Sequence, residues 1–157
     1  MKQSVFARIR GQFFHSYFLM KRPMTLGVRA MVVNEADNSV FLVRHTYVPG
    51  WYMPGGGVER GQTLRQALAM ELAEEGNIFL TCEPELFGVY FNAGSSVRDH
   101  VALFICRSWQ QPSPRLPDRE ISEAGFFPLA ALPEGTSEST RRRIGEVMSG
   151  ARAEELW

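Results

Sequence analysis

The segment His100–Arg107 constrains the fold of this chain most strongly, because it predicts a strand that is apolar on both faces. One face would carry Ala102, Phe104 and Cys106, and the other Val101, Leu103 and Ile105. Such strands lie in sheets that are covered on both sides. A chain of 157 residues is long enough to bury a sheet of this kind within one domain. We therefore expect an α/β fold in which helices cover both faces of a central sheet.

The other strands are predicted by short runs rich in β-branched and aromatic residues. Leu26–Val33 and Val40–Arg44 flank a polar turn, and Leu86–Phe91 precedes the doubly apolar strand. A last strand is expected at Ile121–Phe127, after a loop with three prolines, and a closing helix at Ser137–Met148. The alternation of strands and helices, without internal repeats, agrees with the layered α/β fold.

Composition and charge limit the function classes. Apolar residues make up 45% of the chain and charged residues 22%, as in ordinary globular proteins. The 17 basic and 17 acidic side chains balance, so nothing indicates a nucleic-acid polymer as partner. Cys82 and Cys106 form no CxxC pair, and His15, His45 and His100 lack a short metal-ligand spacing. We therefore expect neither a disulfide scaffold nor a zinc site.

The first 22 residues are basic and carry apolar side chains at helical spacing. This stripe consists of Phe6, Ile9, Phe13, Tyr17 and Met20. We expect an amphipathic helix over residues 1–22, packed on a single domain of residues 23–157 or at a homodimer interface. Binding to an anionic membrane surface is the alternative. The stretch is too interrupted for export or membrane spanning, so we expect a cytoplasmic protein without a transmembrane segment.

The segment Trp51–Ile78 is the strongest indication of function. Residues 54–57, Pro-Gly-Gly-Gly, suit neither a regular helix nor a strand interior, and glycines let the backbone approach a ligand closely. A helix is then predicted from the N-cap residue Thr63 to about Glu75. The glycine and asparagine that follow can supply the left-handed residue that ends it.

The acidic residues of this helix lie on an unexpected side. Glu71 and Glu75 share a sector with the core-facing Leu64 and Leu68, and Glu74 lies at its edge. Two like charges four residues apart, and acids at a helix C-terminus, are each mildly destabilising. A bound Mg²⁺ would compensate, because hard cations prefer carboxylate oxygens. A solvated acidic surface is the alternative reading of the same residues.

The same segment resembles the Nudix box, the motif of hydrolases that cleave nucleoside diphosphates linked to another moiety. That box is a glycine, five residues, a glutamate, seven residues, then Arg-Glu-apolar-x-Glu-Glu-x-Gly-apolar. The matching positions are Gly56, Glu71, Leu72, Glu74, Glu75 and Ile78. The departures are Gln62 for the first glutamate, Met70 for the arginine and Asn77 for the last glycine.

The resemblance implies a Nudix-like α/β/α sandwich with a central mixed β-sheet, and a metal-dependent pyrophosphohydrolase. It implies that Glu71, Glu74 and Glu75 are catalytic and, with Gly55, hold Mg²⁺ or Mn²⁺. The resemblance also offers two candidates for a further carboxylate, Glu120 and Glu123. Each is either an additional metal ligand or a surface charge.

Substrate choice is less strongly encoded than the reaction. A small phosphorylated nucleotide-type molecule is the expected partner. Arginines suit its phosphates, and aromatic rings can stack on a base. We expect Arg44, Tyr47, Gly56 and Arg98 to contact it, although each can equally be structural.

Two departures from the box bear on activity. In the family the arginine is understood to brace the acidic cluster, and the first glutamate helps to hold that arrangement. Gln62 and Met70 remove one acid and one cation together, which suggests a paired replacement. We expect weaker metal affinity or slower turnover than an intact box would give. A binding module that senses a nucleotide without cutting it is the alternative function.

Overall fold

The structure, a computed structural model, describes Tyr17 and residues 20–157. Its strands are β1 (Thr25–Asn34), β2 (Ser39–His45), β3 (Phe79–Leu80), β4 (Glu85–Phe91), β5 (Asp99–Cys106), β6 (Trp109–Gln110) and β7 (Ile121–Pro128). The helices whose bounds are defined are α2 (Leu64–Gly76) and α3 (Glu138–Ser149). The five long strands and the closing helix agree with their predicted bounds to about one residue. The short β3 and β6 were not predicted.

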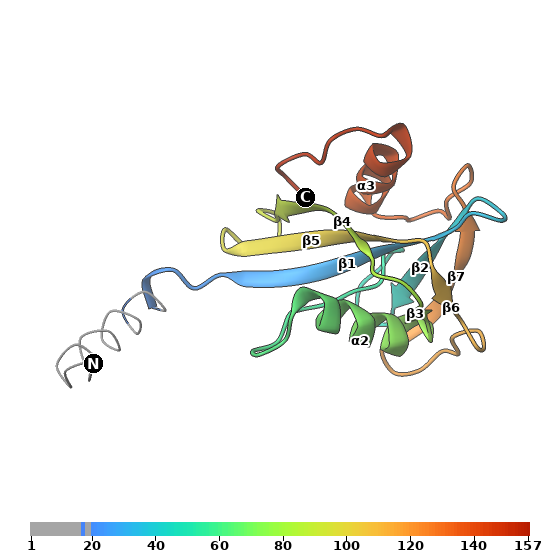
Figure 1. The fold of residues 1–157 in the computed structure, drawn as a ribbon, viewed down its shortest axis with the longest axis horizontal. Helices are drawn as coiled ribbons and strands as arrows, with labels where there is room; N and C mark the ends of the chain where they lie inside the picture. The colour runs from blue at the N-terminus through green and yellow to red at the C-terminus, as the bar shows by residue number, and fades with distance from the viewer. Residues whose placement is uncertain (1–16, 18–19) are drawn as a thin grey trace.

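Five strands form a mixed sheet in the order β4-β5-β1-β2-β7. β1 and β5 are parallel, and the other neighbours are antiparallel. Helix α2 packs on one face of this sheet and α3 on the other (Figure 1). The predicted α/β/α layering with a central mixed sheet is therefore confirmed.

Strand β5 has the double cover that its sequence predicts. Each residue of Val101–Cys106 is at most 5% exposed. Alternate side chains enter the core beneath α2 and the core beneath α3. Burying a large apolar side chain stabilises a fold by about 1.5–3 kcal/mol, so this strand contributes to both halves of the core.

The site depends on a separation between β1 and β2. These strands pair at only two positions, next to the turn that joins them. Beyond that point residues 51–57, the glycine segment, run between the two strands. The Val28 N–H donates to the Gly56 carbonyl over 2.9 Å. On its other side, Tyr52 and Val43 exchange two backbone hydrogen bonds of 2.9 Å each. The glycine segment is thus held from both sides by the sheet.

The predicted N-terminal helix, residues 1–22, falls largely outside the described residues. Its packing on the domain and a homodimer interface therefore stay predictions. In the part of the chain that is described, no helix is long and apolar enough to cross a membrane.

Candidate active site

Helix α2 presents the predicted glutamates, and local interactions fix both of its ends. At its start the Thr63 hydroxyl accepts the Gln66 N–H over 3.2 Å, and the Gln66 side chain accepts the Thr63 N–H over 2.9 Å. Such a capping box stabilises a helix N-terminus. At its end Asn77 adopts the left-handed conformation, with φ 51°. The predicted N-cap and left-handed terminus are both confirmed.

Two of the three glutamates lie against the glycine segment. Glu75, whose side chain is only 12% exposed, accepts the Gly55 N–H at Oε2 over 2.7 Å. The Glu71 carboxylate lies over Gly56, where a Cβ atom would come within 2.2 Å of Oε1. Glu74, in contrast, is exposed. The helical phase read from the sequence therefore agrees with the structure, since Glu71 and Glu75 face inward.

Arg29, a residue that the sequence reasoning missed, holds the other side of the glycine segment. Its Nη1 atom donates to the Gly55 carbonyl and, over 3.1 Å, to the Met53 carbonyl. The Gly55 residue is thus bound through its N–H by Glu75 and through its carbonyl by Arg29. A lone arginine within the apolar run of β1 was the signal that could have identified it.

Burial and mutual repulsion set the charges of this cluster. The pKa of Glu75 is raised to about 7, chiefly by burial; the charges of Glu71 and Glu120 also raise this pKa, whereas the Gly55 N–H and Arg29 lower it. Burial and then the charge of Glu74 raise the pKa of Glu71. These carboxylates resist being ionised together, a condition that a nearby cation would relieve.

His45 adds an imidazole to the cluster. Its Nε2 atom lies 3.6 Å from Glu75 Oε1, and its side chain is 7% exposed. Burial and the neighbouring Arg29 lower the pKa of His45, so the neutral form is favoured. The His45 Nδ1 atom is buried without a hydrogen-bond partner among the described residues.

The two candidates for a further carboxylate separate in the structure. Glu120 lies close enough that its charge raises the pKa of Glu71, Glu75 and His45. Glu123 instead pairs with Arg44 over 3.0 Å, and both side chains are about half exposed. The electrostatic effect of Glu120 and the ion pair of Glu123 therefore favour Glu120 as a neighbour of the cluster.

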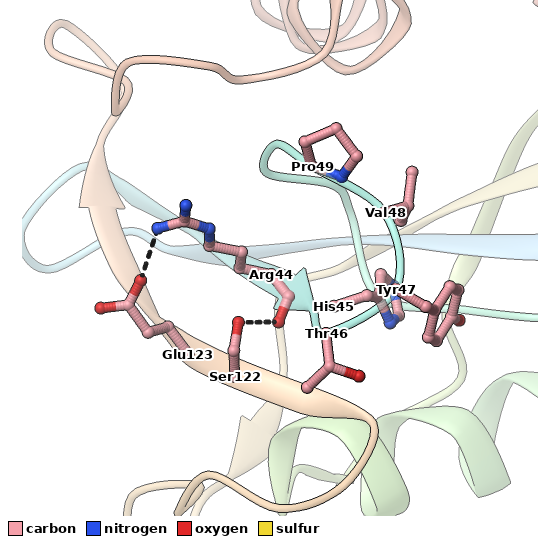
Figure 2. Close-up of a pocket in the computed structure, with 8 residues that line it drawn as sticks. All are labelled: Arg44, His45, Thr46, Tyr47, Val48, Pro49, Ser122 and Glu123. Atoms are coloured by element: carbon pink, nitrogen blue, oxygen red, sulfur yellow. Dashed lines mark hydrogen bonds and ion pairs between the residues drawn. The ribbon is translucent and has the colours of Figure 1, made fainter.

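A pocket of about 550 Å³ opens beside the cluster (Figure 2). Its lining comes from the end of β2, the loop that follows and the start of β7. The lining residues are Arg44, His45, Thr46, Tyr47, Val48, Pro49, Ser122 and Glu123. Two predicted substrate-binding residues, Arg44 and Tyr47, thus line one pocket, and the Tyr47 side chain is largely exposed.

Arg98, a third predicted substrate-binding residue, lies elsewhere. It is exposed, and its carbonyl accepts the Thr25 N–H over 3.0 Å at the start of β1. Among the residues described, no interaction connects its side chain to the pocket or the carboxylates. The structure therefore does not bring it to the site.

Two of the three altered positions of the box, Gln62 and Met70, lie against each other. Gln62 precedes α2, and its Nε2 atom is 3.7 Å from Met70 Sδ on the exposed side of the helix. A weak N–H···S contact replaces the ion pair expected in the motif. The paired nature of the replacement is thus visible in the structure, since each new side chain is the other's neighbour.

The carboxylates of the cluster do not converge on one point as the ligands of a bound metal would. Within Tyr17 and residues 20–157, no three His, Cys, Asp or Glu side chains are close enough to hold an ion as they stand. The donor chemistry nevertheless fits a hard cation, because the inward-facing groups are carboxylates with pKa values raised by burial and repulsion.

A model of the NUDIX domain matches residues 23–147. The chain belongs to the NUDIX domain family. Proteins of Mus musculus and Homo sapiens named 8-oxo-dGDP phosphatase NUDT18 are each 29% identical to it over 108 residues. That alignment covers 68% of this chain and 33% of the relative. The chain therefore spans about a third of the length of the curated NUDIX relatives that it matches.

Solved NUDIX structures have the same fold. A MutT NUDIX hydrolase from Burkholderia pseudomallei superposes with a TM-score of 0.67 at 22% identity, covering 78% of this chain and 97% of that one. An ADP-ribose pyrophosphatase from Streptococcus suis gives 0.65 at 20% identity, covering 85% and 96%. A UDP-X diphosphatase gives 0.66 at 21% identity, covering 100% and 89%. These likenesses confirm the predicted Nudix-like sandwich.

The buried carboxyl of Glu75 should make the metal-free protein less stable as pH rises. A carboxyl whose pKa is raised from 4.5 to about 7 binds its proton more tightly when folded, so stability is lost from about pH 4.5 through pH 7. Glu75→Gln keeps an acceptor for the Gly55 N–H without the charge. We expect it to raise the free energy of unfolding in EDTA by about 2–3 kcal/mol at pH 8, and by less than about 1 kcal/mol at pH 5.

Urea unfolding at the two pH values measures this effect. The matched control is Glu74→Gln, one residue away and exposed, which should change stability by less than about 0.5 kcal/mol at either pH. A Glu75→Gln protein less stable than the wild type at pH 8 would contradict the assignment of a strained buried charge.

Proposed function

We propose that this NUDIX-family chain is a metal-dependent pyrophosphohydrolase that cleaves a phosphate anhydride in a nucleoside diphosphate linked to another moiety. The observation that carries the proposal is the contact of Glu71 and Glu75 with the glycine segment. The family assignment supports the expectation of a Nudix-type hydrolase that acts on phosphate anhydrides.

Members of the family generally use divalent metals, and Mg²⁺ or Mn²⁺ would suit the groups present here. The holding residues would be Glu71, Glu74 and Glu75, with the Gly55 backbone beside them. When bound, such a cation would neutralise the charge of the diphosphate and polarise its phosphorus–oxygen bonds. The raised pKa values of Glu71 and Glu75 support a site for a positive ligand, since burial and, to a smaller extent, neighbouring carboxylates disfavour their charged forms.

The reaction needs a water to attack a phosphorus atom in line with the bond that breaks. The new oxygen–phosphorus bond forms as the anhydride bond opens, and the other phosphate leaves with the electron pair. One carboxylate of the cluster takes the proton of the attacking water.

The pocket beside the cluster is the proposed site for the rest of the substrate. The largely exposed ring of Tyr47 can stack on a base, and Arg44 can donate hydrogen bonds. Because the NUDT18 relatives are named for 8-oxo-dGDP, an oxidised guanine nucleoside diphosphate is the first compound to test.

A nucleotide-binding module without hydrolysis is the second candidate. The contact of Gln62 with Met70 favours it, because that pair replaces charges expected in the box. The inward-facing Glu71 and Glu75 favour hydrolysis, since a binder of phosphates gains nothing from buried carboxylates.

A cleavage panel tests the proposed function. We would incubate the protein with 8-oxo-dGDP, nucleoside triphosphates, ADP-ribose and nucleotide sugars, with Mg²⁺ or Mn²⁺, and detect released phosphate and nucleoside monophosphate. We expect metal-dependent cleavage of at least one compound, lost at least about 100-fold in a Glu74→Gln, Glu75→Gln double variant. Because Glu75→Gln should stabilise the fold, unfolding would not explain that loss. Metal-dependent binding without cleavage would instead support the sensor function.

Gly56→Ala should displace the Glu71 carboxylate and so lower the activity. A methyl group at Gly56 would lie 2.2 Å from Glu71 Oε1, so the carboxylate must move. We expect kcat on the best substrate of the panel to fall about tenfold or more. Gly57→Ala is the matched control, because its Cβ meets nothing within 4 Å. Equal activity of the two variants would show that the position of Glu71 is unimportant.

Restoring the charged pair of the box should strengthen the site. In the double variant Gln62→Glu, Met70→Arg, the two side chains already face each other across 3.7 Å, so an ion pair can form. We expect about a twofold to tenfold gain in Mn²⁺ affinity or kcat, measured by titration and steady-state kinetics. The single variants serve as controls, since each introduces one unpaired charge. A double variant with no gain in either quantity would remove the reason for treating Gln62 and Met70 as a weakness.

A further inference from the structure

Arg115, in the loop between β6 and β7, joins the end of α2 to the segment that carries Glu120. Its Nε atom donates to the Glu74 carbonyl over 2.7 Å, and its Nη1 atom donates to the Leu116 carbonyl over 2.6 Å. Its Nη2 atom pairs with Asp118 Oδ2. The Arg115 side chain is only 18% exposed, so its position is defined by three acceptors at once.

Asp118 links Arg115 to the backbone of Glu120. Its Oδ1 atom accepts the N–H groups of Glu120 and Ile121, each over 2.8 Å. The Ile121 N–H, Arg115 and the Glu120 N–H lower the pKa of Asp118 to about 2, so the carboxylate stays charged at any working pH. The backbone at Glu120 is therefore held by an ionised group that Arg115 holds in turn.

Thr46 holds the same segment from the opposite side. Its N–H donates to the Glu120 carbonyl over 2.8 Å, and its hydroxyl donates to the Arg119 carbonyl over 2.7 Å. Thr46 follows His45 and lines the pocket. The segment with Glu120 is thus fixed between α2 and the end of β2, the two elements that supply the rest of the cluster.

Arg115 also corrects a defect of α2. The last turn of this helix contains glutamates and no basic residue, although the partial negative charge of a helix C-terminus favours a cation. Arg115 supplies that cation from 41 residues away and contacts the backbone of Glu74 rather than its carboxylate. The carboxylates remain available while the helix end is stabilised.

We propose that Arg115 is a positioning residue, which acts through Asp118 to fix the carboxylate of Glu120 relative to Glu71 and Glu75. The proposal rests on the proposed function only in assuming that these carboxylates work together. Glu120 adjoins Ile121, which pairs with His45, and the His45 ring lies 3.6 Å from Glu75. Arginine is required because lysine cannot reach three divergent acceptors with one planar group.

Another contact between the same helix end and the same loop provides a matched control. The Asn77 side chain donates to the Ser113 carbonyl and hydroxyl, each over 2.9 Å. Asn77→Gly removes both bonds but keeps a residue suited to the left-handed conformation. It loosens the loop without touching the path from Arg115 to Glu120.

The test is a double-mutant cycle with Arg115→Met and Glu120→Gln in the full chain. Arg115→Met alone should lower kcat about tenfold or more with less than about a threefold change in KM. In the Glu120→Gln background, Arg115→Met should cost less than about threefold, because the group that it positions is already lost. Arg115→Lys should not rescue, Asn77→Gly should keep kcat within about threefold of the wild type, and Asp118→Ala should reproduce Arg115→Met.

The same variants are titrated with Mn²⁺ and followed by electron paramagnetic resonance, so the proposal does not depend on cleavage. Mn²⁺ binding with a non-additive cycle, but without cleavage, would leave the Arg115 proposal standing and remove the proposed hydrolysis. Equal losses from Arg115→Met in both backgrounds would overturn the proposal, as would a Glu120→Gln variant indistinguishable from the wild type. Absence of Mn²⁺ binding in the wild-type protein would overturn it as well.

Discussion

The hydrogen bond from the Gly55 N–H to Glu75 is the interaction on which the rest of the site depends. It joins the glycine segment to α2, and the carbonyl of the same residue accepts Arg29. Only glycine fits there, because φ is +140° and a Cβ would lie 2.1 Å from the Val28 carbonyl oxygen. The buried acid, the arginine and the missing side chain therefore meet at one residue, which Glu75 holds through its N–H and Arg29 through its carbonyl.

Charge compensation in this protein comes from outside the helix that needs it. Glu71 and Glu75 face inward near the C-terminus of α2, which costs stability twice, once by burial of a charge and once by repulsion from the helix dipole. Arg29 from β1 and Arg115 from the β6–β7 loop offset part of that cost. Both bind backbone carbonyls and leave the carboxylate oxygens of Glu71 without a hydrogen bond among the described contacts. Compensation of this kind stabilises the fold while keeping the carboxylates open to a ligand.

The features that the sequence predicts correctly are local ones. The doubly apolar β5, the phase of Glu71 and Glu75 on their helix, and the N-cap at Thr63 follow from periodicities over a few residues. The acceptors of Arg29 and Arg115 lie 26 and 41 residues away, so no local pattern predicts these contacts, and only the lone charge of Arg29 in an apolar run gives any signal. Arg98 shows the limit of such local reading: its position before a strand suggests a site, but pairing with β1 puts its backbone beside Thr25, so contact with a substrate stays a prediction.

Arg29 offers a physical reason why the box can carry Gln62 and Met70 in place of a charged pair. An arginine at position 70 would brace the cluster from within α2 itself. Here Met70 faces Gln62 on the exposed side, and the positive charge that lowers the pKa of Glu75 is that of Arg29 in the sheet. Arg29 holds the glycine segment to β1 and not to α2. The contacts of that segment with the helix come from Glu75, through its hydrogen bond with the Gly55 N–H, and from Glu71, which lies over Gly56. The geometry of the site therefore depends on the same two carboxylates whose charged forms are disfavoured by burial and by mutual repulsion.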